Sequence, residues 1–406
     1  MLTAKMQKNI ILRVQGADKI RPQHPWVYRS QIARCAQEPQ PGEVVGVLTH
    51  RGQWVGRGYY NALSEITIRL LTRQETEAID VQFFLKRLRR ALEHRRQFVL
   101  DTDAYRIVNS EADGLPGLIL DRYGPCLVMQ ILTRGMDLLR PLFLEALRDA
   151  VPHEGLYEKS DSSSRSIEGL EPRVEWVKEY GVPQAVVHEK NVQFAVEFGK
   201  GHKTALYLDQ RENRFLLSEL MRGRKVLDAF CHEGAFGLHL AKAGCTVLGI
   251  DIQPETIARA EFNRQQNGIA PEQLAFKTAN VFNELRAMTS PSRGKLTAQM
   301  LYDAVILDPP SFLRKKSSQE TAMGAYKEII LRSMKLLRDG GLLAVFSCSY
   351  HLDLGLLMHC CLEAAVDSHK NLRVIKFMKQ SADHPIDPFI PETYYLKGVL
   401  LEICAS

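Results

Sequence analysis

The chain has 406 residues, of which 45% are hydrophobic and 25% are charged, a balance typical of globular proteins. This length is too great for one ordinary hydrophobic core, so we expect two or three domains. The formal net charge of +6 excludes a strongly acidic chain and suits a polyanionic partner, although charge alone does not identify one.

The distribution of apolar residues and cysteines argues against a membrane protein and against a disulfide-rich protein. The longest apolar runs are too short to span a bilayer, and charges interrupt the apolar residues of the N-terminus. The eight cysteines lie mostly in apolar segments and show neither CxxC pairs nor Cys/His ligand spacing. We therefore expect a cytoplasmic protein with reduced thiols and no metal site.

Residues 1–75 have the pattern of a small β-barrel domain. Short strands are expected in IILRV, EVVGVLTH, QWVGRGYYN and ITIRLLT, with PGE and RGQ as turns. Basic and aromatic side chains are interleaved at Lys5, Lys8, Lys19, Arg21, His24, Trp26, Tyr28, Arg29 and Arg34. Such a face can bind nucleic acid, and a solvated charged surface explains it equally well.

Residues 76–198 are expected to form a small α+β domain. Its first segment, IDVQFFLKRLRRALEHRRQFVL, has apolar residues at helical spacing. The opposite face carries Lys86, Arg87, Arg89, Arg90, Arg95 and Arg96. We expect a packed surface helix, with an RNA-contacting helix as the alternative. Strands are expected in RIVN, LILDRYG and CLVMQILT, a helix in MDLLRPLFLEALRDA, and further strands in GLYEKSD, VEWVKEY and AVVHEKNVQFAVEF.

From residue 199 to residue 406, strands and helices alternate. Seven strands are expected, in KVLDAF, TVLGIDI, LAFKTANV, YDAVILDPP, LLAVFSCS, LRVIKFMK and YYLKGVLLEI. This alternation predicts an α/β fold with a doubly wound, mostly parallel, Rossmann-like sheet. Ligands of such sheets bind at the carboxyl ends of the strands.

The first three strands of this region each end on a polar side chain. The first ends at Asp228, and a turn through Gly234 leads into a helix; without the GxGxxG glycines, this turn suits a cationic amino-acid group better than a phosphate. Asp251 ends the second strand, where a carboxylate can accept both ribose hydroxyls of a nucleoside. Asn280 follows the third and can bond an adenine edge. Together these strand ends favour a nucleoside cofactor.

The fourth strand ends in LDPPSF, which adds an acid, two stiffening prolines and an aromatic ring to the same edge. Asp308 starts this motif. Pro309 and Pro310 present carbonyl groups, and Phe312 is a candidate platform for a flat base. The following loop carries Arg314, Lys315 and Lys316, where contact with phosphate groups and solvation are both plausible.

The fifth strand ends in FSCSYH, with a thiol at its carboxyl end. Because the fifth strand should neighbour the fourth, we expect Cys348 beside Asp308 and the cofactor. A thiolate that adds to carbon 6 of a pyrimidine makes carbon 5 nucleophilic enough to accept a methyl group. The alternative is that Cys348 is a small hydrophobe ending a core strand.

The motifs VLDAFCHEGAFG, LDPPSF and FSCSYH together resemble the class I S-adenosylmethionine (SAM)-dependent RNA methyltransferases. The resemblance is greatest to the large-subunit rRNA cytosine-5 methyltransferases with an N-terminal PUA domain. It extends through HPWVYRS, GRGYYN, SEADGLPGLILDRYG, GHKTALYLDQRENR and HPIDPFIPETYYLKG. It implies a PUA-like barrel, a middle domain and a seven-stranded methyltransferase sheet, with SAM as cofactor and rRNA as partner. The sequence leaves the oligomeric state open, and a homodimer is one possibility.

The resemblance also implies roles for individual residues. Cys348 matches the nucleophile, and Asp308 matches the acid that holds the base and helps to shift charge onto its ring. The positions that match the cofactor site are Asp228, Phe230, Gly234, Asp251, Asn280, Asp308, Tyr207, Gln210 and Arg214. Contacts with the RNA are expected at Pro309, Pro310, Phe312, Arg314, Lys315 and Lys316. We expect nearby cations to lower the pKa of the Cys348 thiol below that of a free cysteine.

The chain departs from the family pattern in three places. Asn280 stands where Asp is usual, and His202 and Ala205 stand where Gln and Gly are expected. Ser311 follows the prolines, where another branch of cytosine-5 enzymes has a second cysteine. The resemblance therefore implies a single-cysteine mechanism in which another base removes the proton from carbon 5.

Two alternative functions stay open at this point. A D/N-PP-aromatic motif also serves amino methylation, so the chain could be a SAM-dependent rRNA guanine-N2 methyltransferase, for which Cys348 would be dispensable. It could also be a non-catalytic RNA-binding assembly factor that keeps the fold as a scaffold. In that case it would not bind SAM.

Overall fold

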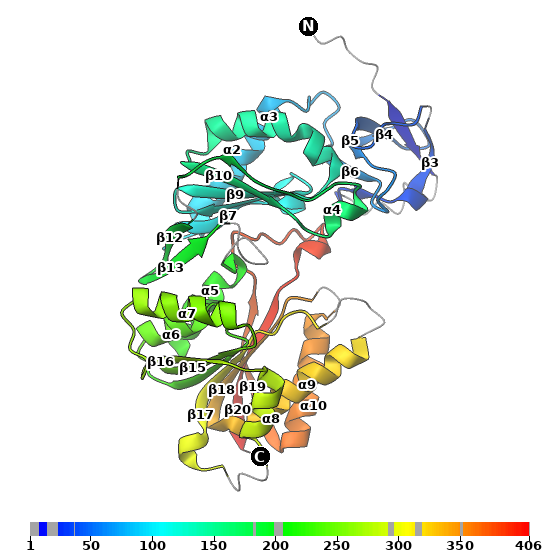
Figure 1. Ribbon diagram of the computed structural model, residues 1–406. Helices are drawn as coiled ribbons and strands as arrows, with labels where there is room; N and C mark the ends of the chain where they lie inside the picture. The colour runs from blue at the N-terminus through cyan, green and yellow to red at the C-terminus, as the bar shows by residue number, and fades with distance from the viewer. Residues whose placement is uncertain are drawn as a thin grey trace. The chain divides into compact units, whose positions relative to one another are not determined.

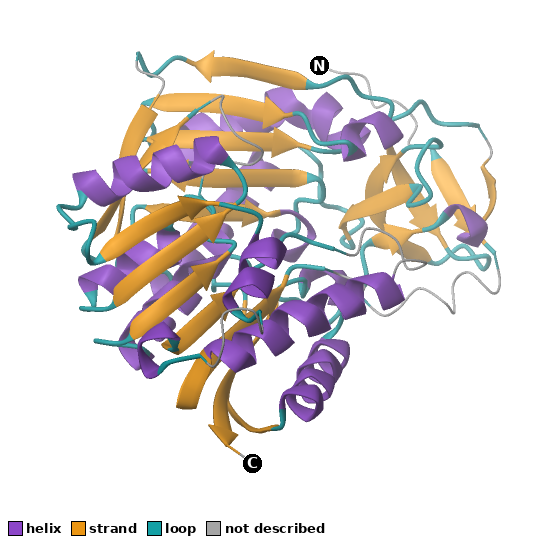
Figure 2. Ribbon diagram, turned by 60° about the horizontal axis from the view of Figure 1, so that its bottom comes forward, coloured by secondary structure: helices purple, strands orange, loops and turns teal. Residues whose placement is uncertain are grey.

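The structure is a computed structural model that describes residues 8–13, 23–35, 37–181, 184–198, 206–290, 296–312, 319–349 and 352–405 (Figures 1 and 2). It divides the chain into two compact units. The first unit comprises Met1–Val187, Val196–Ala205 and Ala382–Thr393, and the second comprises His188–Ala195, Leu206–Ser381 and Tyr394–Ser406. Neither unit is one continuous stretch of chain. The three-domain division expected from the sequence stays a prediction.

The N-terminal part of the first unit is a six-stranded sheet with its own apolar core. Its strands are β1 (Asn9–Leu12), β2 (Trp26–Val27), β3 (Ile32–Cys35), β4 (Val44–Leu48), β5 (Trp54–Tyr60) and β6 (Ile68–Thr72), in the order β2-β6-β5-β4-β1-β3. The pair β1 and β4 is parallel, and the other pairs are antiparallel. The core includes Ile10, Val45, Val47 and Ile68.

The rest of the first unit is built on a five-stranded sheet in the order β11-β10-β9-β8-β7. Its strands are β7 (Ala104–Asn109), β8 (Leu118–Tyr123), β9 (Cys126–Ile131), β10 (Gly155–Ser160) and β11 (Arg173–Lys178). Helices α2 (Val81–Phe98) and α3 (Arg134–Ala150) pack side by side over this sheet (Figure 1), and α4 (Ser164–Ile167) is a short helix. The hairpin of β12 (Gln184–Glu189) and β13 (Val192–Glu197) forms a separate two-stranded sheet.

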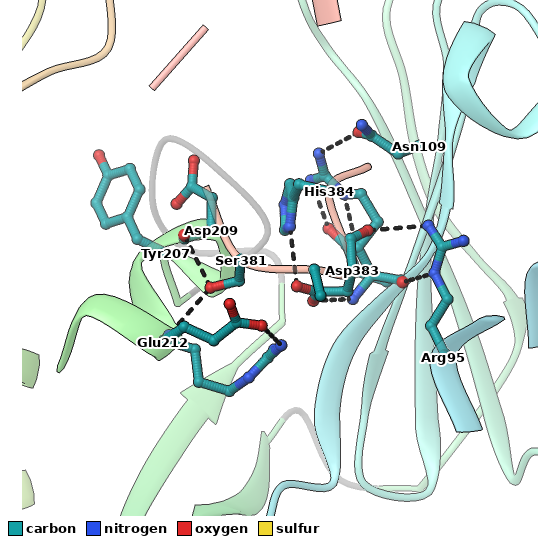
Figure 3. Close-up of polar contacts among 12 residues, drawn as sticks. Arg95, Asn109, Tyr207, Asp209, Glu212, Ser381, Asp383 and His384 are labelled. Atoms are coloured by element: carbon teal, nitrogen blue, oxygen red, sulfur yellow. Dashed lines mark hydrogen bonds and ion pairs between the residues drawn. The ribbon is translucent and has the colours of Figure 1, made fainter. Parts of the chain in front are cut away.

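The basic face of α2 includes fewer residues in the structure than we expected from the sequence. Arg95 is buried and makes two bonds to the Asp113 carboxylate, of 2.6 and 2.7 Å. It also donates to the backbone oxygen of Asp383 at 2.9 Å (Figure 3). Arg87 pairs with Glu77 at 3.2 Å. Helical spacing alone could not reveal this, because the acceptors lie outside the helix. Lys86, Arg89, Arg90 and Arg96 are exposed.

The aromatic members of the expected nucleic-acid face also differ from one another. Trp26 donates from Nε1 to Glu111 Oε1 at 2.9 Å, and the Arg69 guanidinium lies 5.4 Å from its ring centroid. Trp26 is therefore held by protein groups, whereas Tyr28 is 38% exposed. Lys5, Lys19 and Arg21 lie outside the described residues.

The second unit is built on a seven-stranded sheet in the order β16-β15-β14-β17-β18-β20-β19. Its strands are β14 (Lys225–Ala229), β15 (Thr246–Asp251), β16 (Leu274–Thr278), β17 (Tyr302–Leu307), β18 (Leu337–Ser347), β19 (Lys370–Lys379) and β20 (Lys397–Ala405). The first five are parallel to one another, and β20 is antiparallel to β18 and β19. The strand order reverses between β14 and β17. Doubly wound sheets bind ligands at this switch point.

Two groups of helices accompany this sheet. Helices α5 (Arg211–Leu220), α6 (Ala235–Lys242) and α7 (Pro254–Gln266) form one group, and α8 (Val281–Met288), α9 (Gln319–Leu336) and α10 (Leu354–Ser368) form the other. Apolar residues of the second group share a core with β14, β17, β18 and β20. Helix α7 begins with Pro254, and the left-handed Gly268 follows its end, which are the usual positions of proline and glycine at helix limits. Within the described ranges, no helix is long and apolar enough to cross a bilayer.

Candidate functional site

The carboxyl ends of β14, β15, β17 and β18 lie along one edge of the sheet. In the parallel register, Ala229 is opposite both Ile250 and Leu307, and Leu307 is opposite Val345. The acids and the thiol that follow these strands are therefore gathered at the switch point. This local arrangement follows from the sequence, because each strand is an apolar run that ends on a polar residue.

Asp228 has the strongest local sign of a missing partner. It is 1% exposed, and its Oδ2 accepts the Gly237 N–H at 3.1 Å, while its buried Oδ1 has no hydrogen-bond partner among the described residues. Burial and the negative charge of Asp308 raise its pKa to about 7, with Gly237 acting against them and Asp251 adding to them. A buried carboxylate oxygen without a partner is costly. The site therefore suits a ligand that brings a hydrogen-bond donor, such as an ammonium group.

The turn after β14 is tightly wound, with three residues in the left-handed region. Phe230 has a φ of 66°, His232 of 50° and Gly234 of 76°. A Cβ added to Gly234 would lie 2.4 Å from Cζ of Phe276, so both the backbone conformation and the space require glycine there. The turn brings its backbone close to β15, where the Cys231 N–H donates to the Ile250 backbone oxygen at 3.0 Å.

The side chains of Asp251 and Asn280 both accept hydrogen bonds from nearby backbone N–H groups. The Asp251 carboxylate accepts the N–H groups of His232 and Gln253, each at 3.0 Å. Its remaining lone pairs can still accept ribose hydroxyls. Asn280 caps α8, because its Oδ1 accepts the Asn283 N–H at 3.2 Å. Its amide nitrogen is the group left for the adenine contact predicted from the sequence.

The segment from Tyr207 to Arg214 reaches the site through Gln210. Gln210 Nε2 donates to Asp308 Oδ2 at 3.1 Å, and its Oε1 accepts from Asn213 Nδ2 at 2.6 Å. The Arg214 guanidinium is buried in a pair with Glu189, at 2.5 and 2.9 Å, and also donates to the Tyr207 backbone oxygen at 2.9 Å. Arg214 therefore orients Tyr207 through the backbone, and a direct contact of Arg214 with the cofactor stays a prediction.

A second set of bonds fixes the start of this segment. Ser381 Oγ donates to the Asp209 backbone oxygen at 2.9 Å and accepts the Glu212 N–H at 3.0 Å (Figure 3). The Tyr395 hydroxyl donates to Asp209 Oδ2 at 2.8 Å. The Tyr207 ring is thereby held against His232, with ring centroids 4.9 Å apart.

Cys348 follows β18 directly, is half-buried, and shares its surroundings with Asp308. Burial raises the pKa of Tyr207 well above its usual value, and the charges of Asp308, Asp209 and Cys348 raise it further. Burial also raises the pKa of Tyr326, and Cys348 and Asp308 again add to the shift. The thiol and the acid thus lie within electrostatic reach of the same two phenols.

The residues expected to contact RNA differ in their exposure to solvent. Pro310 is exposed and Pro309 is buried. The Phe312 ring lies 5.2 Å from Tyr326 and 5.6 Å from Phe282, centroid to centroid, within an aromatic cluster that also includes Phe230. Part of the Phe312 ring surface is therefore covered by other aromatic rings, and only the rest is available to a base. Arg314, Lys315, Lys316, His202, Ala205, Tyr350 and His351 lie outside the described residues.

Sequence reasoning missed several residues that the structure brings to this region. Asn213, Glu189, Tyr326 and Lys397 all contact or influence predicted site residues. A lysine inside the mostly apolar segment YYLKGVLLEI was a usable signal for one of them. Among the described residues, no group of three or more His, Cys, Asp or Glu side chains could hold a metal ion.

Two family models match the chain: a PUA-like domain over residues 10–73 and an S-adenosylmethionine-dependent methyltransferase over residues 170–390. A ribosomal RNA large subunit methyltransferase I from Photobacterium profundum is 38% identical over 395 residues, 96% of this chain and 98% of the relative. A protein of the same name from Shewanella amazonensis is 36% identical over 385 residues, 94% and 95% of the two chains. These matches confirm the predicted family and SAM as its cofactor.

Solved structures of low sequence identity share the fold. A candidate SAM-dependent methyltransferase from Streptococcus mutans superposes with a TM-score of 0.80 at 18% identity, over 97% of this chain and 99% of the other. A methyltransferase structure in complex with S-adenosylhomocysteine has the same score, identity and coverage. With the family models, these matches confirm the predicted fold class, an α/β methyltransferase sheet preceded by a PUA-like domain.

Proposed function

The chain belongs to the family of SAM-dependent methyltransferases with an N-terminal PUA-like domain, and we propose that it methylates carbon 5 of a cytosine in large-subunit rRNA. The names of its relatives support rRNA as the substrate. The observation that carries the choice of atom is the thiol of Cys348, which follows the strand next to the one that Asp308 follows. Methylation of an exocyclic nitrogen needs no such thiol.

The residues at the switch point fit SAM. The partnerless Oδ1 of Asp228 is suited to the ammonium of its methionine part, and the spare lone pairs of Asp251 are suited to its ribose hydroxyls. Gly234 lets the backbone approach closely. When bound, SAM supplies an electrophilic methyl group on a sulfonium.

The chain's own groups supply the activation of the base. The Cys348 thiolate forms a bond to carbon 6, and the electron pair of the 5,6 double bond moves into the ring and makes carbon 5 nucleophilic. Asp308, oriented by Gln210, holds the base while this charge develops. After carbon 5 carries the methyl group, a base removes its proton, the double bond re-forms, and the bond between sulfur and carbon 6 breaks to return the thiolate.

The RNA must present an accessible cytosine. Carbon 6 is hidden in a paired stem, so the target is extruded or lies in opened RNA. The PUA-like domain and the exposed arginines of α2, which include Arg89, Arg90 and Arg96, support binding to the phosphate backbone. The cytoplasm, where ribosomal subunits are found, is the compartment that this function implies.

The test compares wild type with Cys348→Ala on target rRNA in which the cytosines are replaced by 5-fluorocytosine. Fluorine cannot leave carbon 5 as a proton does, so an enzyme that adds its thiol to carbon 6 is trapped as a protein–RNA adduct. We expect the adduct with wild type and with Cys35→Ala, and none with Cys348→Ala. Nucleoside mass spectrometry of rRNA from cells that lack the protein would map the lost methyl group.

Each alternative predicts a different result. If Cys348→Ala methylates unmodified RNA at the wild-type rate, the thiol mechanism is wrong, and a methyl group on guanine N2 would identify the amino-methylating alternative. If calorimetric titration detects no binding of SAM at millimolar concentration, the scaffold alternative holds. The mass of the methylated nucleoside therefore decides between the candidate functions.

A further inference from the structure

A lysine ammonium is buried directly beneath the turn that carries the candidate nucleophile. Lys397 begins β20, is 3% exposed and lies opposite Ser347 in the antiparallel register with β18. Its Nζ donates to the backbone oxygens of Ser349 at 3.1 Å and Tyr395 at 3.2 Å. Lys397 therefore holds one end of the short segment in which Cys348 lies between two serines.

This ammonium lacks the partner that buried lysines usually have. Within the described part of the chain, it makes no ion pair of 4.0 Å or less with a carboxylate; its acceptors are the two carbonyl groups, and the centroid of the Tyr394 ring lies 5.5 Å from its Nζ. Burial lowers the pKa of Lys397, while the charges of Asp353 and Cys348 act to raise it. Leu396 before the strand and Val399 within it are apolar and buried. Burying an ammonium here costs more desolvation free energy than burying an apolar side chain would. This cost points to a role for the charge.

We propose that Lys397 is a positioning residue that fixes the turn of Cys348 and supplies the positive charge that favours the thiolate. This inference rests on the proposed function of Cys348 as the nucleophile. The coupling is reciprocal: because the thiolate stabilises the ammonium, the ammonium stabilises the thiolate by the same free energy. Other methyltransferase activities do not require this pairing.

Four other titratable groups among the described residues of this region act in the opposite direction or carry no charge near neutral pH. Asp308 follows β17, and Asp353 caps the start of α10 by accepting the Leu356 N–H at 2.9 Å. Tyr326 on α9 and Tyr207 before α5 have raised pKa values, so both phenols are neutral. Asp308 and Cys348 influence the same two phenols, and Asp353 and Cys348 influence the same ammonium, so we expect both carboxylates to disfavour ionisation of the thiol. The positive charge of Lys397 offsets them.

The test measures the pH dependence of Cys348 alkylation by iodoacetamide in the full-length protein, without RNA or SAM. Mass spectrometry follows the Cys348 peptide, with the Cys35 peptide in the same sample as the reference thiol. We expect Lys397→Met to raise the pH midpoint by about one unit, which means roughly tenfold slower alkylation below the midpoint. Lys397→Arg keeps the charge and should stay closer to wild type. An unchanged midpoint in folded Lys397→Met would overturn the inference.

A second variant keeps the inference testable if Lys397→Met does not fold. Asp353→Asn preserves a side chain that can cap α10 but removes the negative charge that opposes the thiolate. We expect its midpoint to move down, opposite to the shift for Lys397→Met. A midpoint equal to that of wild type would show that charges at this turn do not control the thiol, and the inference would be wrong.

The two proposals can fail separately. If Lys397→Met shifts the alkylation midpoint while Cys348→Ala still methylates RNA, the function proposed for Cys348 fails and the charge effect holds. If Cys348→Ala is inactive and the midpoint of Lys397→Met is unchanged, only the role of Lys397 fails. A role confined to packing would lower the thermal midpoint of unfolding without moving the alkylation midpoint.

Discussion

At the scale of single residues, Asp228 indicates a ligand, because burying its carboxylate costs free energy that a bound hydrogen-bond donor would recover. Its carboxylate ends a buried strand, and one of its oxygens lacks a partner among the described residues. Its position was readable from the sequence as a polar residue after an apolar run. Its raised pKa was not, because that depends on burial and on Asp308, which lies 80 positions further along the chain.

We predict that Asp228→Asn stabilises the ligand-free protein at neutral pH and abolishes SAM binding. The pKa rises from 3.8 in the unfolded chain to about 7 in the folded one, which corresponds to up to about 4 kcal/mol, less the cost of burying the amide. The stability that protonated Asp228 contributes to the folded protein is fully present below pH 3.8 and is lost as the pH rises through 7. The advantage of Asp228→Asn in unfolding free energy should therefore grow from pH 5 to pH 7 and then level off.

Denaturant titrations at several pH values, with and without SAM, measure both effects. Wild type should gain stability when SAM is added, and Asp228→Asn should not. The exposed Asp149→Asn in α3 is the control for a change of net charge and should behave like wild type. A variant that is less stable than wild type at pH 8, or that keeps the SAM effect, would contradict the assignment of Asp228.

At the scale of secondary-structure elements, one buried acid joins β12 to α5 and α6. Glu189 is fully buried, pairs with Arg214 at 2.5 Å, and lies 3.1 Å from His239 Nε2. Burial alone would raise its pKa, but the charges of Arg214 and His239 and their hydrogen bonds outweigh burial and lower it to about 2. This pairing supports the backbone of Tyr207 through Arg214, so an element outside the sheet stabilises the site.

We predict that Glu189→Gln destabilises the protein by about 3 kcal/mol at pH 7, because it leaves the Arg214 charge buried without its partner. Since the folded pKa of Glu189 is lowered, its contribution is present above its ordinary value of 4.5 and is lost as the pH falls toward 2. The difference between variant and wild type should shrink accordingly in urea titrations at lower pH.

The matched control is the double variant Glu189→Met with Arg214→Met, which removes both charges together. It should recover much of the stability that Glu189→Gln loses. If Glu189→Gln unfolds at the same urea concentration as wild type at pH 7, the pair does not hold these elements together.

At the scale of the whole molecule, the chain passes between its two units after residues 187, 195, 205, 381 and 393. Residues 188–195 belong to the second unit, although they precede the start of the methyltransferase domain predicted at residue 199. Two of their backbone N–H groups donate to asparagine side chains at α7: Gln193 N–H to Asn267 Oδ1, and Ala195 N–H to Asn263 Oδ1.

We predict that a fragment of residues 188–406 is more stable than a fragment of residues 199–406. The shorter fragment lacks Glu189 and both of these N–H groups, so Arg214, Asn263 and Asn267 lose their partners. Thermal unfolding followed by circular dichroism should show a lower midpoint for the shorter fragment, or aggregation. Introducing Glu189→Gln into the longer fragment is the control, and it should account for part of the difference. Equal midpoints for both fragments would show that residues 188–198 are not part of the second folding unit.

The sequence by itself determined the succession of strands and helices, the α/β class and the polar strand ends. These depend on periodicity and on neighbours within a few residues, as at Asp228, Asp251 and Cys348. Only the tertiary structure decided which charges are buried and what they face. Arg95, Arg214 and Lys397 read as basic residues like any others, yet their partners lie 18, 25 and 48 residues away. The free energy of a buried charge depends on contacts made across the fold, and local sequence does not encode those contacts.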